Sequence, residues 1–202
     1  MKKYINKKSI IIASVMLLLL VAVGTTIAYI FTETEPVENT FNPSKVSCAV
    51  VENGYEPVSG EIQNISDIKS NVQIKNTGDT DAYIRVAVVV NWMDEAGTKV
   101  WATKPVEGTD YSITYATDSG WLKGADGFWY YTSPVAVDDI TEVLISDCHL
   151  LDMATIPEGF YLSVEIVASA LQSTPEYVVT DQWSSGVDSV GTDGTLTIRP
   201  AE

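Results

Sequence analysis

The residues that could do chemistry lie around the only histidine of the chain. Asp147, Cys148 and His149 are consecutive, and Asp152 follows three positions later. Carboxylates, thiolates and imidazoles all bind zinc, but neighbouring side chains of a strand point to opposite faces, so Cys148 and His149 would point apart. A Ser/His/Asp triad would also need His149, and no Gly-x-Ser-x-Gly turn presents a serine. We therefore predict no catalytic site, no metal site and a protein that is not an enzyme.

The two cysteines, Cys48 and Cys148, are candidates for a disulfide. Outside the cell two thiols can oxidise, and a bridge that closes a loop of about 100 residues would stabilise the fold by roughly 4 kcal/mol. Cys48, however, lies in an apolar run and Cys148 stands beside His149, a setting also typical of buried free thiols. Both alternatives stay open, because the sequence does not give the distance between the two Cα atoms.

The charge of the chain changes sharply after its first residues. The 202 residues include 12 basic and 27 acidic side chains, and four of the basic ones are Lys2, Lys3, Lys7 and Lys8. The residues after position 28 therefore carry eight basic and 27 acidic side chains, a net charge of −19. This charge repels nucleic acids and anionic lipid surfaces and excludes them as partners. Weak calcium binding is the only cofactor use that the composition allows, and no loop has the residue spacing of a calcium site.

Residues 1–28 have the pattern of a secretory signal peptide. The lysines are followed by uncharged, apolar residues from position 10 to about 23, and small residues close the segment. Thr26 and Ala28 stand at the third and first positions before the expected cut, so we predict cleavage between Ala28 and Tyr29.

The alternative is an uncleaved membrane anchor. Apolar character runs from Ile10 to Phe31, and about 22 residues are enough to span a bilayer. Both interpretations place the rest of the chain outside the cell, because the lysines hold the N-terminus inside. The protein is thus predicted to be secreted or held at the cell surface, with membrane contact only through an uncleaved signal.

Residues 29–45 are predicted to be extended, because their prolines, asparagines and glutamates discourage a helix. Apolar side chains are spaced along the segment, at Tyr29, Ile30, Phe31, Val37 and Phe41. A segment of this kind can add as a strand to the sheet of another subunit, and repeated addition to the next copy builds an open fibre. The alternative is that it pairs within its own domain or stays loose.

Residues 46–185 are predicted to form a β-sandwich of jelly-roll or immunoglobulin type. Alternating apolar residues and turn residues mark strands at Val46–Val51, Val72–Lys75, Asp81–Trp92, Thr98–Trp101, Tyr111–Ala116, Trp121–Leu122, Phe128–Tyr131, Ile140–Ile145, Gly159–Leu171 and Thr195–Arg199. Asp81–Trp92 is apolar on both faces, which predicts a strand in the middle of its sheet. We expect a short helix within Pro175–Trp183, and an acidic, Gly- and Ser-rich tail at 186–202.

Five aromatic residues lie close together in one predicted hairpin, at Trp121, Phe128, Trp129, Tyr130 and Tyr131. An exposed row of such rings would stack on sugars and make the protein a glycan-binding module. The alternative is that alternate rings fill the core while the others cover a sheet face, with tyrosine hydroxyls reaching water. Aromatic residues are common in strands, so the pattern favours the second interpretation.

Several motifs, taken in order, resemble the TasA and camelysin family of Gram-positive bacteria. Residues 24–41, around the predicted cut, are similar to leaders processed by the SipW-type signal peptidase. Val72–Val86 resembles the strand pair of the family, in which Asn-Thr-Gly precedes an aromatic residue and an arginine. Asp126–Tyr131 is similar to its Asp-Gly-aromatic stretch, and Val164–Gln172 to its long late strand, with Trp183 as the closing tryptophan.

The resemblance implies a jelly-roll subunit of extracellular biofilm-matrix fibres, which assembles by donating its N-terminal strand to a neighbour. The implied partners are further copies of the chain or other matrix proteins, together with the SipW-type signal peptidase. Camelysin has been classed as a metallopeptidase, but the residues of this chain form no metal cage, so that activity is not carried over. Two cysteines and the tail after Trp183 depart from the family pattern. A cell-surface module that binds a glycan or a protein without polymerising is the alternative function.

Overall fold

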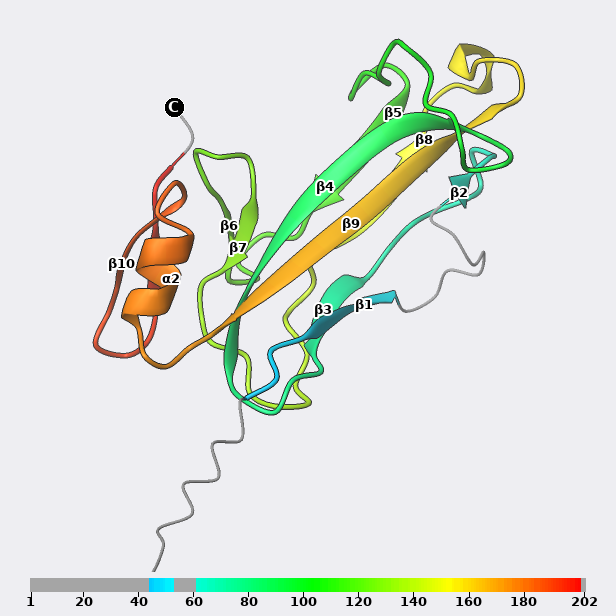
Figure 1. Ribbon diagram of the computed structural model, residues 1–202. Coiled ribbons are helices and arrows are strands. Elements are labelled where there is room, and N and C mark those ends of the chain that lie inside the picture. The colour runs from blue at the N-terminus through cyan, green and yellow to red at the C-terminus, as the bar shows by residue number, and fades with distance from the viewer. Residues whose placement is uncertain (1–43, 53–60, 201–202) are drawn as a thin grey trace, which may run out of the picture. The chain divides into compact units, whose positions relative to one another are not determined.

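The computed structural model describes residues 44–52 and 61–200 (Figure 1). Within these ranges the helical elements are a 3-10 helix at Met153–Thr155 and the α-helix α2 at Tyr177–Gln182. The strands are β1 Cys48–Glu52, β2 Glu61–Ile62, β3 Val72–Asn76, β4 Ala82–Asp94, β5 Tyr111–Tyr115, β6 Trp121–Lys123, β7 Trp129–Tyr131, β8 Ile145–Leu150, β9 Phe160–Gln172, β10 Val187–Val190 and β11 Leu196–Ile198. The predicted all-β fold and the short predicted helix are confirmed.

Most strands belong to two antiparallel sheets, termed the first and the second sheet. The first has the strand order β1–β3–β8–β5, and the second has the order β2–β9–β4–β7–β6. Side chains of both sheets meet in one core, where Val72 and Ile74 of β3 are fully buried with Ile84 and Val86 of β4. Burial of one such side chain contributes about 1.5–3 kcal/mol, so this shared core is the main force that holds the two sheets together.

Strands β4 and β9 form a long antiparallel pair that dominates the second sheet. They pair along all 13 residues, from Ala82 opposite Gln172 to Asp94 opposite Phe160. Both contain several β-branched and aromatic residues, which suit a pleated surface, and both contain the period-two pattern of a strand. As predicted, β4 lies inside its sheet, between β9 and β7.

Two predicted strands differ from the structure. At Thr98–Trp101 only Val100 pairs, in a single bridge with Met93. The strand predicted at Ile140–Ile145 begins only at its last residue and continues to Leu150 as β8. The cause is Thr141, whose buried Oγ1 accepts the backbone N–H of Ile74 and so replaces a backbone carbonyl in the ladder.

The predicted tail at 186–202 is wrong, because most of it belongs to the folded domain. Strands β10 and β11 pair as a hairpin. Its turn at 191–195 contains glycine and aspartate, a composition that is also typical of a loose tail. Val187 and Leu196 of this hairpin are buried together with Val179 of α2. We call α2, β10 and β11 together the C-terminal lobe. The domain boundary expected at residue 185 therefore does not exist.

The C-terminal lobe is attached to the outer face of the second sheet by aromatic and polar contacts. The Arg85 guanidinium of β4 lies 4.2 Å from the centre of the Phe128 ring and 4.8 Å from that of Trp183. Tyr130 is fully buried and donates a hydrogen bond from its hydroxyl to Asp126, at 2.6 Å. Ser185 of the lobe donates to the same carboxylate at 2.8 Å. Cation–π and charge-assisted hydrogen bonds thus join the lobe to the sheet.

Candidate functional site: the open edge of strand β9

Among the described residues, strand β9 has one fully paired edge and one edge that is paired at only two positions. Its inner edge follows β4 along its whole length, whereas its outer edge pairs with β2 only at Ser163 and Leu162. From Val164 to Gln172, none of the described strands pairs with this outer edge. Alternate residues of an antiparallel strand direct their N–H and C=O groups to each edge, so every second residue of this stretch presents both groups on the outer edge, where no described strand pairs with them.

The side chains beneath this edge are apolar and only partly covered. Ile166, Ala168 and Ala170 of β9 pack against the shared core but stay half-buried, as do Val88 and Val90 of β4. The reason is length, because the strands of the first sheet have five or six residues and cannot cover a pair of 13. We call these five side chains the half-covered strip.

Strand β1 lies close to β9 without pairing with it, and it pairs instead with β3 along five residues. The far end of β1 is held by an ion pair in which Lys69 Nζ lies 2.6 Å from Glu52 Oε1. The Lys69 side chain is only 3% exposed, so this partner offsets the cost of burying it. The ion pair therefore fixes the strand that runs beside the open edge.

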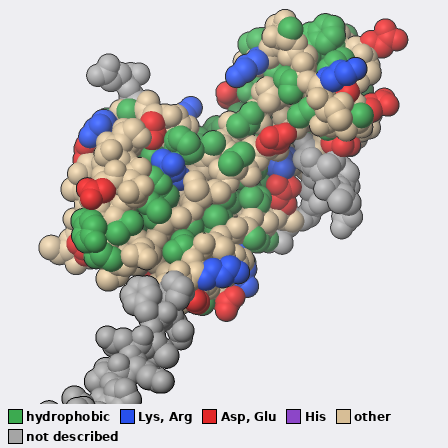
Figure 2. All heavy atoms as spheres, viewed as in Figure 1, with side chains coloured by type: hydrophobic (Ala, Val, Ile, Leu, Met, Phe, Trp, Pro, Cys, Tyr) green, Lys and Arg blue, Asp and Glu red, His purple; other side chains and the backbone are tan. Residues whose placement is uncertain are grey.

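The outer face of the same strand is also exposed. Val167 stands opposite Ala87 and is 53% exposed, and Glu165 beside it faces solvent. Figure 2 shows hydrophobic side chains along the middle of the molecule, where the long strand pair faces the viewer in Figure 1. An edge that is long, apolar and not paired by any described strand is a surface on which further strands add readily.

The candidate disulfide between Cys48 and Cys148 is not formed, and both residues are free thiols. Cys48 stands opposite Asn76 at one end of β3, whereas β8 pairs with the other end, at Val72, and reaches Cys148 three residues later. Four strand residues alone span about 13 Å, which exceeds the Cα separation of about 7 Å that a disulfide tolerates. Of the two alternatives, the structure therefore has the free thiols.

The cluster around His149 divides between two faces, as the strand pattern predicts. Cys148 is fully buried, while Asp147 and His149 lie on the other face, with Asp147 Oδ2 at 2.6 Å from His149 Nδ1. Burial, followed by the charge of Asp147, raises the pKa of Cys148 to about 12, so the thiol stays protonated and weakly nucleophilic. Among the residues that the structure describes, no three histidine, cysteine or acidic side chains gather as metal ligands.

The five aromatic residues of the β6–β7 hairpin are engaged inside the protein. Trp129 stacks on Tyr115 with ring centres 4.1 Å apart, and Trp121 lies against Tyr131 at 5.2 Å. Trp121 and Tyr130 are buried, and Phe128 carries Arg85. This arrangement agrees with the second interpretation of the sequence, in which these rings fill the core and cover a sheet face.

The residues predicted at the cleavage site and in the assembly segment lie outside the described residues. These are Thr26, Ala28, Tyr29, Ile30, Phe31, Val37 and Phe41. In the described part of the chain, no helix has both the length and the apolar character needed to cross a membrane. The acceptor edge on β9 was not predicted, because alternation marks a strand and its faces but does not show which of its edges remains unpaired.

The motifs behind the family resemblance occupy defined structural positions. In the Asn-Thr-Gly motif, the Asn76 amide donates to the carbonyls of Thr80 and Val135, and its Oδ1 accepts the N–H of Gly78. Gly78 leaves no room for a Cβ atom, which would collide with the carbonyl oxygen of Lys45. The motif thus shapes the turn between β3 and β4.

Comparison of the chain with protein-family models, with curated proteins and with solved structures finds no match.

Proposed function

We propose that the protein is a secreted structural subunit that assembles into extracellular fibres by strand addition. The N-terminal segment Tyr29–Phe41 of one copy would pair along the outer edge of β9 in the next copy. The observation that carries this proposal is the unpaired edge from Val164 to Gln172 above the half-covered strip. As the motif resemblance implies, we further propose that the domain is a jelly-roll sandwich and that its signal peptide is cleaved. The fibres would belong to the biofilm matrix of a Gram-positive bacterium.

The chemistry of the donor segment matches that of the edge. Phe31, Val37 and Phe41 have the same parity, so in an extended strand their side chains share one face. That face would cover the half-covered strip, and each backbone hydrogen bond formed along the edge would add about 0.5–1.5 kcal/mol. Main-chain pairing supplies affinity and the apolar side chains supply register, as in other cases of strand addition.

The direction of the chain before β1 favours a donor from another copy. The N–H of Thr77 donates to the carbonyl of Ser47, and that of Asp79 donates to Lys45. Residues 45–47 thus continue the line of β1 past the end of β3, away from the strip. A segment of the same chain would have to reverse sharply to return to β9, whereas a neighbouring copy meets no such requirement.

The test compares the mature chain, beginning at Tyr29, with a variant that lacks Tyr29–Phe41. Electron microscopy is expected to show filaments for the first protein, and size-exclusion chromatography a folded monomer for the second. A synthetic peptide of residues 29–43 is expected to bind the shortened protein at a ratio of one to one. The control peptide has serine in place of Phe31, Val37 and Phe41 and is expected not to bind. If the shortened protein still polymerises, strand donation by this segment is wrong.

The alternative of a glycan-binding module has less support. Its candidate rings pack against other rings, are buried, or lie against Arg85, and this engagement weighs against a free sugar-stacking row. The camelysin-like metallopeptidase has the least support, because His149 pairs with Asp147 and its neighbour Cys148 faces the core. Metal analysis of the purified protein provides a direct test of that alternative.

A further inference from the structure

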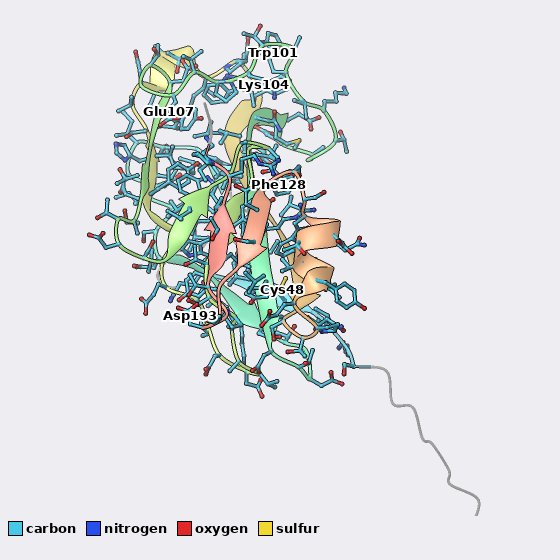
Figure 3. The ribbon with its side chains drawn as sticks, turned by 90° about the vertical axis from the view of Figure 1, so that its left-hand side faces the viewer. Cys48, Trp101, Lys104, Glu107, Phe128 and Asp193 are labelled. Atoms are coloured by element: carbon cyan, nitrogen blue, oxygen red, sulfur yellow. The ribbon has the colours of Figure 1, made fainter. Side chains whose placement is uncertain are left out.

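The loops at the Asp94 and Phe160 ends of the long strand pair form an exposed apolar surface. We call loop 95–110 and segment 151–159 together the tip. Five large apolar side chains of the tip are between 41% and 55% exposed, at Val100, Trp101, Val106, Leu151 and Met153. Figure 3 shows Trp101, Lys104 and Glu107 at this end of the molecule, far from Cys48 and Asp193. An exposed apolar cluster of this kind on an acidic domain is typical of an interaction surface.

The two parts of the tip are fixed to each other. The N–H of Leu151 donates to the carbonyl of Asp110, and the carboxylate of Asp110 accepts the N–H of Val106 at 2.7 Å. The Trp101 ring packs edge-on against Phe160, with ring centres 5.0 Å apart. The surface is therefore preorganised, and a partner would not have to order these loops on binding.

A cavity of about 310 Å³ opens beside these side chains. Its apolar wall consists of Met153, Ile156, Pro157 and Phe160, and its carboxylates belong to Glu95 and Glu158. Both glutamates are exposed, and neither takes part in an ion pair among the described residues. The cavity thus combines an apolar wall with two carboxylates that form no ion pair among the described residues.

This combination fits one kind of side chain. Lysine and arginine carry an aliphatic stem that packs on apolar surface and a cationic head that binds carboxylates. The tip also contains the exposed acidic residues Glu107 and Asp152, and its basic residues are Lys99 and Lys104. Aromatic anchors beside a pocket that holds a charged group are also the usual arrangement of a protein-binding hot spot.

We propose that the tip is a docking site for a segment of a partner protein in which a lysine or arginine is flanked by apolar residues. The basic side chain enters the cavity between Glu95 and Glu158, and the apolar neighbours cover Trp101 and Met153. The proposal goes beyond fibre assembly, because the tip surface is separate from the half-covered strip. The charge complementarity selects a basic partner segment over an anionic lipid surface or a nucleic acid.

The probe is the synthetic peptide Leu-Lys-Val-Lys-Leu, and the matched control has glutamate at both lysine positions. Isothermal titration calorimetry with the full mature chain is expected to detect the basic peptide and not the acidic one. Changing Glu95→Gln and Glu158→Gln together is expected to weaken binding at least tenfold, as is Trp101→Ala. Tyr177→Ala, which alters an exposed ring of the C-terminal lobe, is expected to leave binding unchanged.

Two further measurements distinguish binding at the tip from binding at the half-covered strip and from loss of folding. Ala168→Lys alters the half-covered strip, and it is expected to leave peptide binding at the tip unchanged. Thermal unfolding followed by circular dichroism is expected to give the two glutamine substitutions the melting temperature of the parent chain. Equal binding of the basic and acidic peptides, unchanged binding by the glutamine variant, or binding of phosphatidylglycerol vesicles in place of the peptide would overturn the proposal.

Discussion

The long β4–β9 pair has one region that the C-terminal lobe covers and one that none of the described strands pairs with. Around Tyr83 and Leu171, the C-terminal lobe buries the outer face, and aromatic rings and hydrogen bonds fill the contact. Along Val164–Gln172, the outer edge of β9 has no partner among the described strands. The two regions belong to the same strands and have similar apolar residues. The difference indicates that coverage depends on the reach of neighbouring elements, and the edge beyond the reach of the described strands is where we propose that another chain adds.

The largest expected effect concerns assembly at the open region. Ala168→Lys places a charge within the half-covered strip, where a donor strand would pack, and it is expected to abolish filaments of the mature chain in electron microscopy. Val167→Lys is the matched control, because Val167 is adjacent but lies on the outer face at 53% exposure. It is expected to leave filaments intact. Loss of filaments in both variants would show that the strip is not the surface that matters.

The next effect concerns the covered region. Trp183→Ala removes a buried ring whose centre lies 5.6 Å from that of the Tyr130 ring. The same ring also packs against the Arg85 guanidinium. The loss of a large buried aromatic ring is expected to lower the free energy of unfolding by about 3–5 kcal/mol, measured with urea. Tyr177→Ala, an exposed ring on α2, is expected to change it by less than about 0.5 kcal/mol. Similar values for both variants would mean that the lobe is not packed as described.

A smaller effect is expected where β1 runs beside the open edge. Glu52→Ala leaves the buried Lys69 ammonium without its partner, which is expected to cost about 2–3 kcal/mol in urea unfolding because Glu52 is partly exposed. Asp138→Asn breaks the exposed pair with Lys75 while keeping a side chain that suits the positive φ at this position, and it is expected to cost less than about 1 kcal/mol.

A second variant identifies the cause of that loss. Adding Lys69→Met to Glu52→Ala removes the unpaired charge and is expected to recover part of the lost stability. If the double variant is no more stable than Glu52→Ala alone, the cost comes from the strand position and not from the buried ammonium.

The covered and open regions also differ in how far the sequence could predict them. Period-two alternation located β4 and β9 to within two residues, because faces of a strand are set by local spacing. Strand β11 was predicted at Thr195–Arg199, but its partner β10 was missed, since Gly191, Asp193 and Gly194 form a tight turn whose composition is the same as that of a loose tail. The open edge and the tip depend on which distant segments are long enough to cover them. That is a tertiary property, and no local pattern contains it.

The smallest expected effect is a pH dependence confined to the covered region. Burial alone would raise the pKa of Asp126, but hydrogen bonds from Tyr130, Ser185 and the Phe128 N–H together lower it below its ordinary value. A carboxylate with a lowered folded-state pKa stabilises the fold above the unfolded pKa, which is about 4, and this stability is lost as the pH falls through the folded value. Attachment of the C-terminal lobe is therefore expected to weaken below about pH 4.

Asp126→Asn tests this dependence, because the amide cannot titrate while its single oxygen can take the place of Oδ2, which accepts the hydrogen bonds from Tyr130 and Ser185. Urea unfolding between pH 2 and pH 7 is expected to give the variant a flatter pH profile than the parent chain. Asp181→Asn, which changes an exposed carboxylate on α2, is expected to keep the parent profile. An unchanged slope in Asp126→Asn would assign the acid sensitivity to other carboxylates and would leave the covered region held mainly by its aromatic rings.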